Sequence, residues 1–236
     1  PGGAILAEHQ LNPYGARHVV HFTRSDGTVA DSSFLRAMTN PNQFLQSSAA
    51  LSLAYIYGSV NRLPGLSLYR TANTATGPAH GLETLLNWTH AKLKAAVTTP
   101  TTLPSVLPTT VMLATDLSTR LFLLKWGFLP IVASLLIKLG VTGNPQFLYE
   151  LSFCTWTFSL VTNVTHLTGE QVNVAADTTH VFHKLNVVQT LVEMLSAAPS
   201  RKVVRMLIAT LHNLARTEDD DILVDIFGTS CLRHLE

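Results

Sequence analysis

Apolar residues recur at helical spacing on both sides of Pro199. The positions i, i+3, i+4 and i+7 before it are Val188, Leu191, Val192 and Leu195, and those after it are Val204, Leu207, Ile208, Leu211 and, one turn on, Ala215. Proline lacks an N–H and disfavours helix at the preceding residue, so a turn separates two helices here. Because a helical hairpin cannot bury its apolar stripe alone, the pattern predicts stacked neighbours.

Two upstream segments begin in a related way. Residues 40–45 and 144–148 both contain Asn-Pro followed by Phe-Leu, in which Asn is a good N-cap and Pro suits the first helical turn. The long helices that start there, and the one at 201–215, each follow a shorter apolar helix; these shorter helices are 33–38, 128–139 and 187–195. The repeating unit is therefore a helix pair or triplet at irregular spacing, which is typical of armadillo and HEAT arrays.

These patterns predict an all-α protein, a right-handed α-solenoid of armadillo- or HEAT-like helical repeats, because no segment alternates with a period of two. The expected helices lie near 44–57, 82–97, 109–124, 128–139, 146–161, 187–196, 201–216 and 219–235, and the expected loops are 61–81, 98–104 and 167–179. The expected division is an N-terminal extension or partial first repeat at 1–30, the solenoid at 31–216, and the start of a C-terminal helical domain at 217–236. We expect the natural protein to continue this last domain.

The composition favours a large core. Hydrophobic residues make up 47% of the chain and charged residues 13%, so disorder is not indicated. The formal net charge of +1 argues against a nucleic-acid binder. Cys154 and Cys231 have no CxxC or histidine partner, so we expect two buried free thiols. We interpret Trp88, Trp126 and Trp156 as core or inter-repeat packing.

The most apolar segment is 121–139. Lys125, Gly127 and Pro130 interrupt it, and its longest uncharged part is well short of the roughly 20 residues that a transmembrane helix needs. We therefore expect a pair of buried core helices there and no direct insertion into a membrane.

Residues that could carry catalysis are scattered. Of the ten histidines, only His180 and His183 have helical ligand spacing, and Asp177 lies one turn before them in a polar segment. No further ligand completes this set, and the sequence has no nucleophile elbow, P-loop or dinucleotide-binding glycine run. The acidic run 219–221 fits a helix N-terminus. We expect no catalytic residue, no metal site, no bound cofactor and a solvent-exposed histidine pair.

Four residues of the predicted helix 201–216 are candidates for contact with a partner. At about 100° per residue, the side chains of Arg201, Arg205, His212 and Arg216 fall within about 60° of one another, and they flank the apolar stripe (the basic face). In armadillo-like stacks the last helix of each unit lines the concave groove, where a basic face would meet acidic residues of a partner. A solvated helix face with incidental charge is the alternative, and both interpretations stay open.

Several segments resemble a known family. Residues 187–215 are similar to the best-known segment of the H subunit of the vacuolar-type proton ATPase, and 147–156 resemble that family's tyrosine-containing helix with its Cys-x-Trp. Residues 120–132 and 33–38 fall in the family's order, so the resemblance extends over 30–236. Two departures are His212, where the family pattern has an arginine, and the connection 161–186, which is longer than the usual link.

The resemblance implies a non-catalytic regulatory subunit in the cytosolic sector of a rotary proton pump. Members of this family are all-helical, and they bind the peripheral stalk, other subunits of the ATP-hydrolysing sector and the cytosolic arm of the membrane-sector large subunit. They support coupled ATP hydrolysis in the assembled pump and silence hydrolysis when the soluble sector detaches. The resemblance also implies a peripheral position on the cytoplasmic face of vacuolar or other acidic-organelle membranes.

A second interpretation is an armadillo-type peptide-binding or scaffold protein, such as an importin-like transport receptor. The third helices of such receptors carry Trp and Asn one turn apart. The positions four residues after the tryptophans of this chain are Lys92, Pro130 and Leu160. Because this Trp–Asn pair is missing, the pump subunit is the favoured interpretation.

Overall fold

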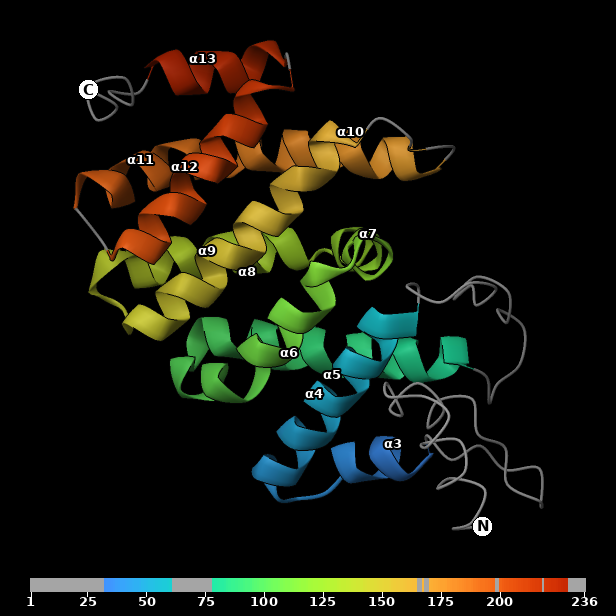
Figure 1. Cartoon of the computed structure of the whole chain (residues 1–236). Helices are drawn as coiled ribbons and strands as arrows, with labels where there is room; N and C mark the ends of the chain where they lie inside the picture. The colour runs from blue at the N-terminus through green and yellow to red at the C-terminus, as the bar shows by residue number, and fades with distance from the viewer. Residues whose placement is uncertain are drawn as a thin grey trace.

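The computed structural model describes residues 32–60, 78–164, 167, 170–197, 200–217 and 219–228, and it places no strand among them. The α-helices are α3 (Ser32–Met38), α4 (Gln43–Val60), α5 (Pro78–Thr98), α6 (Leu103–Thr115), α7 (Leu117–Lys125), α8 (Phe128–Leu139), α9 (Pro145–Ser159), α10 (Glu170–Lys184), α11 (Val187–Ser196), α12 (Arg201–Ala215) and α13 (Asp220–Gly228). Short 3-10 helices are η2 (Pro100–Thr102), η3 (Gly140–Thr142) and η4 (Leu160–Asn163). Figure 1 shows the helices stacked in chain order, which confirms the all-α solenoid.

The helices pack in three rows, because equivalent helices of successive repeats contact one another. The first row contains α7, α10 and α13, the second contains α5, α8 and α11, and the third contains α4, α6, α9 and α12. In Figure 1 the third row runs from α4, in blue, to α12, in orange. One hydrophobic cluster extends through all three rows. The repeat unit is thus a triplet in α7–α8–α9 and again in α10–α11–α12.

Both triplets use the same backbone turn before their second helix. Gly127, before α8, has φ 75°, and Asn186, before α11, has φ 51°, so both residues have a left-handed helical backbone conformation. Glycine adopts this conformation freely, and Asn is one of the few residues with a side chain that tolerates it. The N–H of Gly127 donates to the carbonyl O of Leu124 at 3.0 Å, and that of Asn186 donates to His183 at 2.9 Å. The shared turn supports the division into triplets.

The Asn-Pro signal is confirmed for α9 and displaced for α4. At α9 the N–H of Gln146 donates to Asn144 Oδ1 at 2.9 Å, as an N-cap requires. At α4 the N–H of Phe44 donates to Asn42 Oδ1 at 2.9 Å. Asn40 lies two residues earlier, where its Oδ1 accepts the N–H of Asn42 at 2.9 Å. The second asparagine of the segment is therefore the cap.

The single helix predicted at 109–124 is wrong, because α6 and α7 are separated at Asp116, whose ψ of 138° is extended. The buried guanidinium of Arg120 fills this break. Its Nε donates to the carbonyl O of Ala114 at 2.8 Å, and a terminal nitrogen donates to that of Thr115 at 3.0 Å. A cation at the end of α6 also opposes the negative end of the helix dipole. Apolar spacing continues across the break and so does not reveal it.

The polar loop predicted at 167–179 is also wrong, because helix α10 occupies most of it. Its buried residues are Thr178, Thr179 and Phe182. The hydroxyl of Thr178 donates to the carbonyl O of Val174 at 2.6 Å, so the threonine is satisfied inside its own helix. Two of the buried positions of α10 are thus threonines, and a search for apolar residues at helical spacing does not detect such a helix.

Two other helices also extend into segments that were predicted to be loops. Helices α5 and α6 begin inside the loops expected at 61–81 and 98–104, and each has a proline in its first turn, where proline is tolerated. Cys154 is a buried free thiol, as predicted. The remaining parts of these predictions lie outside the described residues: 1–31, 61–77, 229–236 and Cys231.

The apolar segment 121–139 forms the end of α7 and all of α8. The inner side of α8 is buried, which confirms the prediction of core packing; its buried residues are Phe128, Leu129, Val132, Ala133, Leu135 and Leu136. Within the described ranges, no single helix is long and apolar enough to cross a membrane. Helices α7 and α8 reach that length and composition only together, and they are bent by 79° at their break.

Candidate partner-binding face

Helix α12 packs against α9, α11 and α13, and this packing decides which of its side chains are free. Its buried residues are Val203, Leu207, Thr210, Leu211, Asn213 and Leu214. Leu207 and Leu211 belong to the predicted stripe, but Ile208 of the same stripe is 40% exposed. The helix is therefore rotated relative to the prediction, with Val203 and Leu214 inside.

A polar contact between α9 and α12 explains this rotation. Asn213 Nδ2 donates to Ser159 Oγ at 2.9 Å, and both side chains are buried. In η4, Asn163 Nδ2 donates to the carbonyl O of Asn213 at 2.8 Å. Because a buried amide has to face its partners, Asn213 turns toward α9. Ile208 is consequently left on the free side of α12.

All four residues of the basic face are exposed, as their spacing on α12 predicts. Arg201 is the first residue of the helix and Arg216 is its C-cap, with Arg205 and His212 between them. Arg201, Arg205 and Arg216 form no ion pair with any residue that the structure describes, and α12 contains no Asp or Glu. The basic face is thus open and uncompensated within the described chain, a property that both interpretations of it share.

Helix α9, the neighbour of α12 in the third row, carries a stripe of aromatic side chains. Tyr149, Phe153 and Trp156 recur at i, i+4 and i+7, and all three are half-buried. The ring centroids of Tyr149 and Phe153 lie 6.4 Å apart, and those of Phe153 and Trp156 lie 5.5 Å apart, edge to face. Trp88 and Trp126 pack against the core as predicted. Trp156 is half-buried and packs on Phe153, so its prediction as core or inter-repeat packing is not decided by its burial, and sequence reasoning missed this stripe (the aromatic stripe) although its spacing was visible.

The histidine pair is divided between solvent and a helix contact. His180 and Asp177 are exposed on α10, whereas His183 Nδ1 lies 2.8 Å from Asp225 Oδ2 on α13. The hydrogen bond to Asp225 raises the pKa of His183, and the negative charges of Asp225 and Asp221 raise it further. In the part of the chain that the structure describes, no group of three or more His, Cys, Asp or Glu side chains could hold a metal ion. His183 instead joins α10 to α13.

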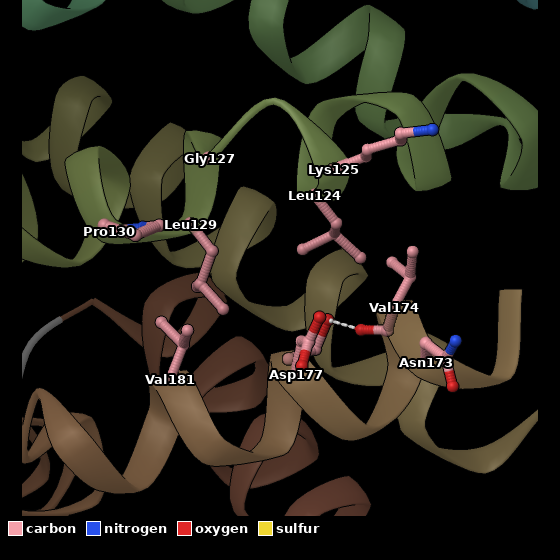
Figure 2. A pocket seen from close by; sticks show the side chains of 10 residues that line it. Leu124, Lys125, Gly127, Leu129, Pro130, Asn173, Val174, Asp177 and Val181 are labelled. Atoms are coloured by element: carbon pink, nitrogen blue, oxygen red, sulfur yellow. Dashed lines mark hydrogen bonds between the residues drawn. The ribbon is translucent and has the colours of Figure 1, made fainter. Parts of the chain in front are cut away.

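Figure 2 shows a cavity of about 300 Å³ between the α7–α8 turn and α10. Its lining residues are Leu124, Lys125, Gly127, Leu129, Pro130, Asn173, Val174, Asp177, Thr178 and Val181. Leu129 and Val181 point toward one another across it, while Lys125 points away. The hydroxyl of Thr178 is bonded to a carbonyl of its own helix. The cavity therefore has a mixed apolar and polar lining, and among the described residues no cluster of His, Cys, Asp or Glu side chains converges on it.

The comparison with protein families decides what kind of chain this is. A family model for the V-ATPase H subunit matches residues 9–236. The chain belongs to the V-ATPase H-subunit family. No curated protein and no solved structure matches it. The resemblance traced over 30–236 is confirmed, and the match also includes residues 9–29.

The region that matches the V-ATPase H-subunit family contains both the exposed basic face of α12 and the half-buried aromatic stripe of α9. The long connection at 161–186 consists mostly of η4 and α10, and α10 is the first helix of the second triplet. His212 is exposed with the rest of the basic face.

Proposed function

We propose that this V-ATPase subunit is regulatory and non-catalytic. It supports coupled ATP hydrolysis in the assembled pump and restrains hydrolysis by the detached cytosolic sector. It does so by bridging the peripheral stalk and the cytosolic arm of the membrane-sector large subunit, as a peripheral component on the cytoplasmic face of vacuolar or other acidic-organelle membranes. The family match over residues 9–236 carries this proposal.

The fold supports a bridging role. A bridge between a moving and a fixed part needs a body that transmits force and exposes separate surfaces. The single hydrophobic cluster joins the described helices of successive repeats, and stacked repeats expose different surfaces along their length. Such a body can hold one element against another without contacting nucleotide.

The basic face supports a contact with acidic residues of the pump. Arg201 and Lys202 occupy the first turn of α12, where the helix dipole disfavours positive charge, and no acidic residue of that turn offsets them. Their position lowers local stability, so the fold itself does not require these charges there. Acidic helices of the stalk or of the membrane-sector arm are the proposed partners of Arg201, Arg205, His212 and Arg216.

A binding role rather than catalysis is also supported by how the described reactive side chains are used. Burial raises the pKa of the Cys154 thiol, and the nearby charge of Glu150 raises it further, which disfavours the nucleophilic thiolate. His183 is engaged by Asp225. These side chains therefore serve the packing of α9 and the contact between α10 and α13.

The test uses vacuolar membranes stripped of their own H subunit. The full chain is added back, and ATP hydrolysis and ATP-driven proton uptake are measured on the same membranes. Recovery of proton uptake per ATP hydrolysed, together with binding of the chain to the membranes, is the expected result. The purified chain alone should release no phosphate from ATP. Failure of the chain to bind either the membranes or the detached ATPase sector would overturn the proposal.

A further inference from the structure

The third row carries most of its charge at one end. Helices α4 and α6 contain no Asp, Glu, Lys or Arg, and α9 contains only Glu150, which accepts a hydrogen bond from Gln146 Nε2 at 2.7 Å. The basic residues of α12 and its C-cap are Arg201, Lys202, Arg205 and Arg216. A ligand that lies across this row meets a nearly uncharged surface over three helices and a basic surface over the fourth.

The uncharged part of the row carries exposed aromatic side chains on α4 and half-buried ones on α9. On α4, Phe44 is 75% exposed and Tyr55 is 55% exposed. On α9 the aromatic stripe follows the free side of the helix, and Phe153 and Trp156 contact each other edge to face. Aromatic side chains bury a large area at low entropic cost and are enriched at the centres of protein interfaces. These aromatic side chains on helices without a basic residue are therefore the candidates for apolar contact with a partner.

The aromatic stripe is ordered by contacts on its inner side. Tyr149 packs against the hydrophobic core, and each ring of the stripe touches the next. At a rise of 1.5 Å per residue, the stripe extends over about 10 Å of α9, which is enough for two or three apolar side chains of a partner. A surface that is already ordered loses little conformational entropy on binding.

We propose that the solvent-facing sides of α4, α9 and α12, with α6 between α4 and α9 (the third-row face), hold one segment of a partner subunit of the pump. Apolar residues of this segment cover the aromatic stripe, and its Asp and Glu residues lie at the end that meets the basic face. The inference rests on the proposed function. It adds which surface of the chain binds, which residues the bound segment contains, and which end of that segment meets the basic face. The apolar contacts supply most of the affinity, and the charges set association rate and register.

The distribution of charge favours a protein segment over a lipid surface. Anionic membranes attract helices with basic residues along the polar face beside an apolar one. In the third row the basic residues are confined to the last helix, while α4 and α6 carry none. This one-ended arrangement fits a chain with an apolar part and an acidic part.

The first experiment measures binding of the full chain to the detached ATPase sector, with its peripheral stalks, after removal of the resident H subunit. Phe153→Ala is compared with Phe227→Ala, which truncates an aromatic side chain on α13 that is 65% exposed. Arg205→Glu is compared with Lys94→Glu, at an exposed position on α5. Kd is measured at low (~50 mM) and high (~300 mM) salt, where screening differs strongly. Circular dichroism confirms that each variant is folded.

The expected results separate the two kinds of contact. Phe153→Ala should raise Kd by about tenfold or more at both salt concentrations, because apolar burial is lost. Arg205→Glu should raise Kd mainly at low salt, because exposed charges are screened at high salt. Both control variants should stay within about twofold of the original chain, as side chains outside an interface do. If Phe153→Ala and Arg205→Glu both bind like the original chain, the inference fails while the proposed function stands; if the original chain does not bind, the proposed function itself fails.

A second experiment tests the direction and the identity of the occupant. Phe153→p-benzoylphenylalanine and Arg205→p-benzoylphenylalanine are photo-crosslinked in the complex, and the products are mapped by mass spectrometry. Both should reach the same segment of one pump subunit, and the site reached from position 205 should lie nearer its acidic residues. Crosslinks between two copies of the chain would overturn the inference. Binding to phosphatidylserine vesicles that both Phe153→Ala and Arg205→Glu abolish would also overturn it.

Discussion

Asn213 on α12 donates its side-chain amide to Ser159 Oγ on α9 at 2.9 Å, and both side chains are buried. Because α9 and α12 are the third helices of successive triplets, this hydrogen bond joins two repeats. Apolar side chains tolerate small rotations of a helix, whereas a buried amide loses its partner if the helix turns. The contact therefore fixes the rotation of α12, and with it the exposure of the basic face.

Replacing Asn213 should destabilise the junction between these two repeats. Asn213→Leu keeps a similar volume but removes the donor to Ser159, which should lower the free energy of unfolding by about 1–3 kcal/mol. A double-mutant cycle with Ser159→Ala, measured by urea unfolding, isolates the pair. A coupling energy of about 0.5 kcal/mol or more is expected, since the side chains are in direct contact. Strictly additive effects would show that the hydrogen bond does not link the repeats.

The rotation of α12 can be tested with two aliphatic residues of the same predicted stripe. Leu211 is 6% exposed and Ile208 is 40% exposed. Leu211→Ala should cost about 2–5 kcal/mol of unfolding free energy, the usual range for a buried leucine. Ile208→Ala should cost less than about 1 kcal/mol, because much of its side chain is already in solvent. Similar losses of unfolding free energy for both variants would instead support the orientation of α12 predicted from the sequence.

Sequence patterns predict the parts of this fold that apolar residues and caps determine. Helix α9 follows from its Asn-Pro start, where Asn144 caps the helix, and helices α11 and α12 follow from apolar spacing around Pro199. The exposure of the basic face follows as well, since residues spaced along one side of a helix share a surface. Family membership could be recognised from the same segments.

The remaining features depend on polar groups that such patterns do not count. Helix α10 buries threonines, the α6–α7 break depends on Arg120, and Asn213 decides how α12 is rotated. In each case a side-chain hydrogen bond to a backbone or polar atom determines the geometry, and its partner is not evident from helical spacing alone. The aromatic stripe was missed for another reason. A tryptophan in a helix is usually assigned to the core, whereas the side chain of Trp156 is only half-buried in this row.

The contact between α10 and α13 should weaken as pH rises. The pKa of His183 is raised by its hydrogen bond to Asp225, with further contributions from the charges of Asp225, Asp221 and Asp219. A raised folded-state pKa means that the protonated histidine stabilises the fold. This stabilisation is fully present below the unfolded-state pKa of about 6.5 and is lost as pH rises through the folded-state value.

Hydrogen exchange of the α13 amides, corrected for intrinsic rates, measures this effect. Protection of α13 should fall relative to α12 as pH increases from about 6.5. His183→Gln should remove the pH dependence, while His180→Gln, at an exposed position of the same helix, should keep it. The same pH profile in His183→Gln as in the original chain would contradict the role given to this contact.

The proposed contact between the basic face and acidic residues of the pump can be tested in the assembled pump. Arg205→Glu combined with Arg216→Glu reverses two exposed charges that make no ion pair with a described residue, so the solenoid should stay folded. The double variant should weaken assembly or lower proton uptake per ATP hydrolysed, because the new carboxylates repel the acidic partner. Exposed charges act mainly through association rate, and salt screens them, so the defect should deepen as ionic strength falls.

Lys94→Glu combined with Lys184→Glu is the matched control on α5 and α10. Normal assembly and pumping by the Arg205→Glu, Arg216→Glu variant at both low and moderate salt would mean that the basic face is only solvated, and the family assignment would stand because it rests on the match over residues 9–236.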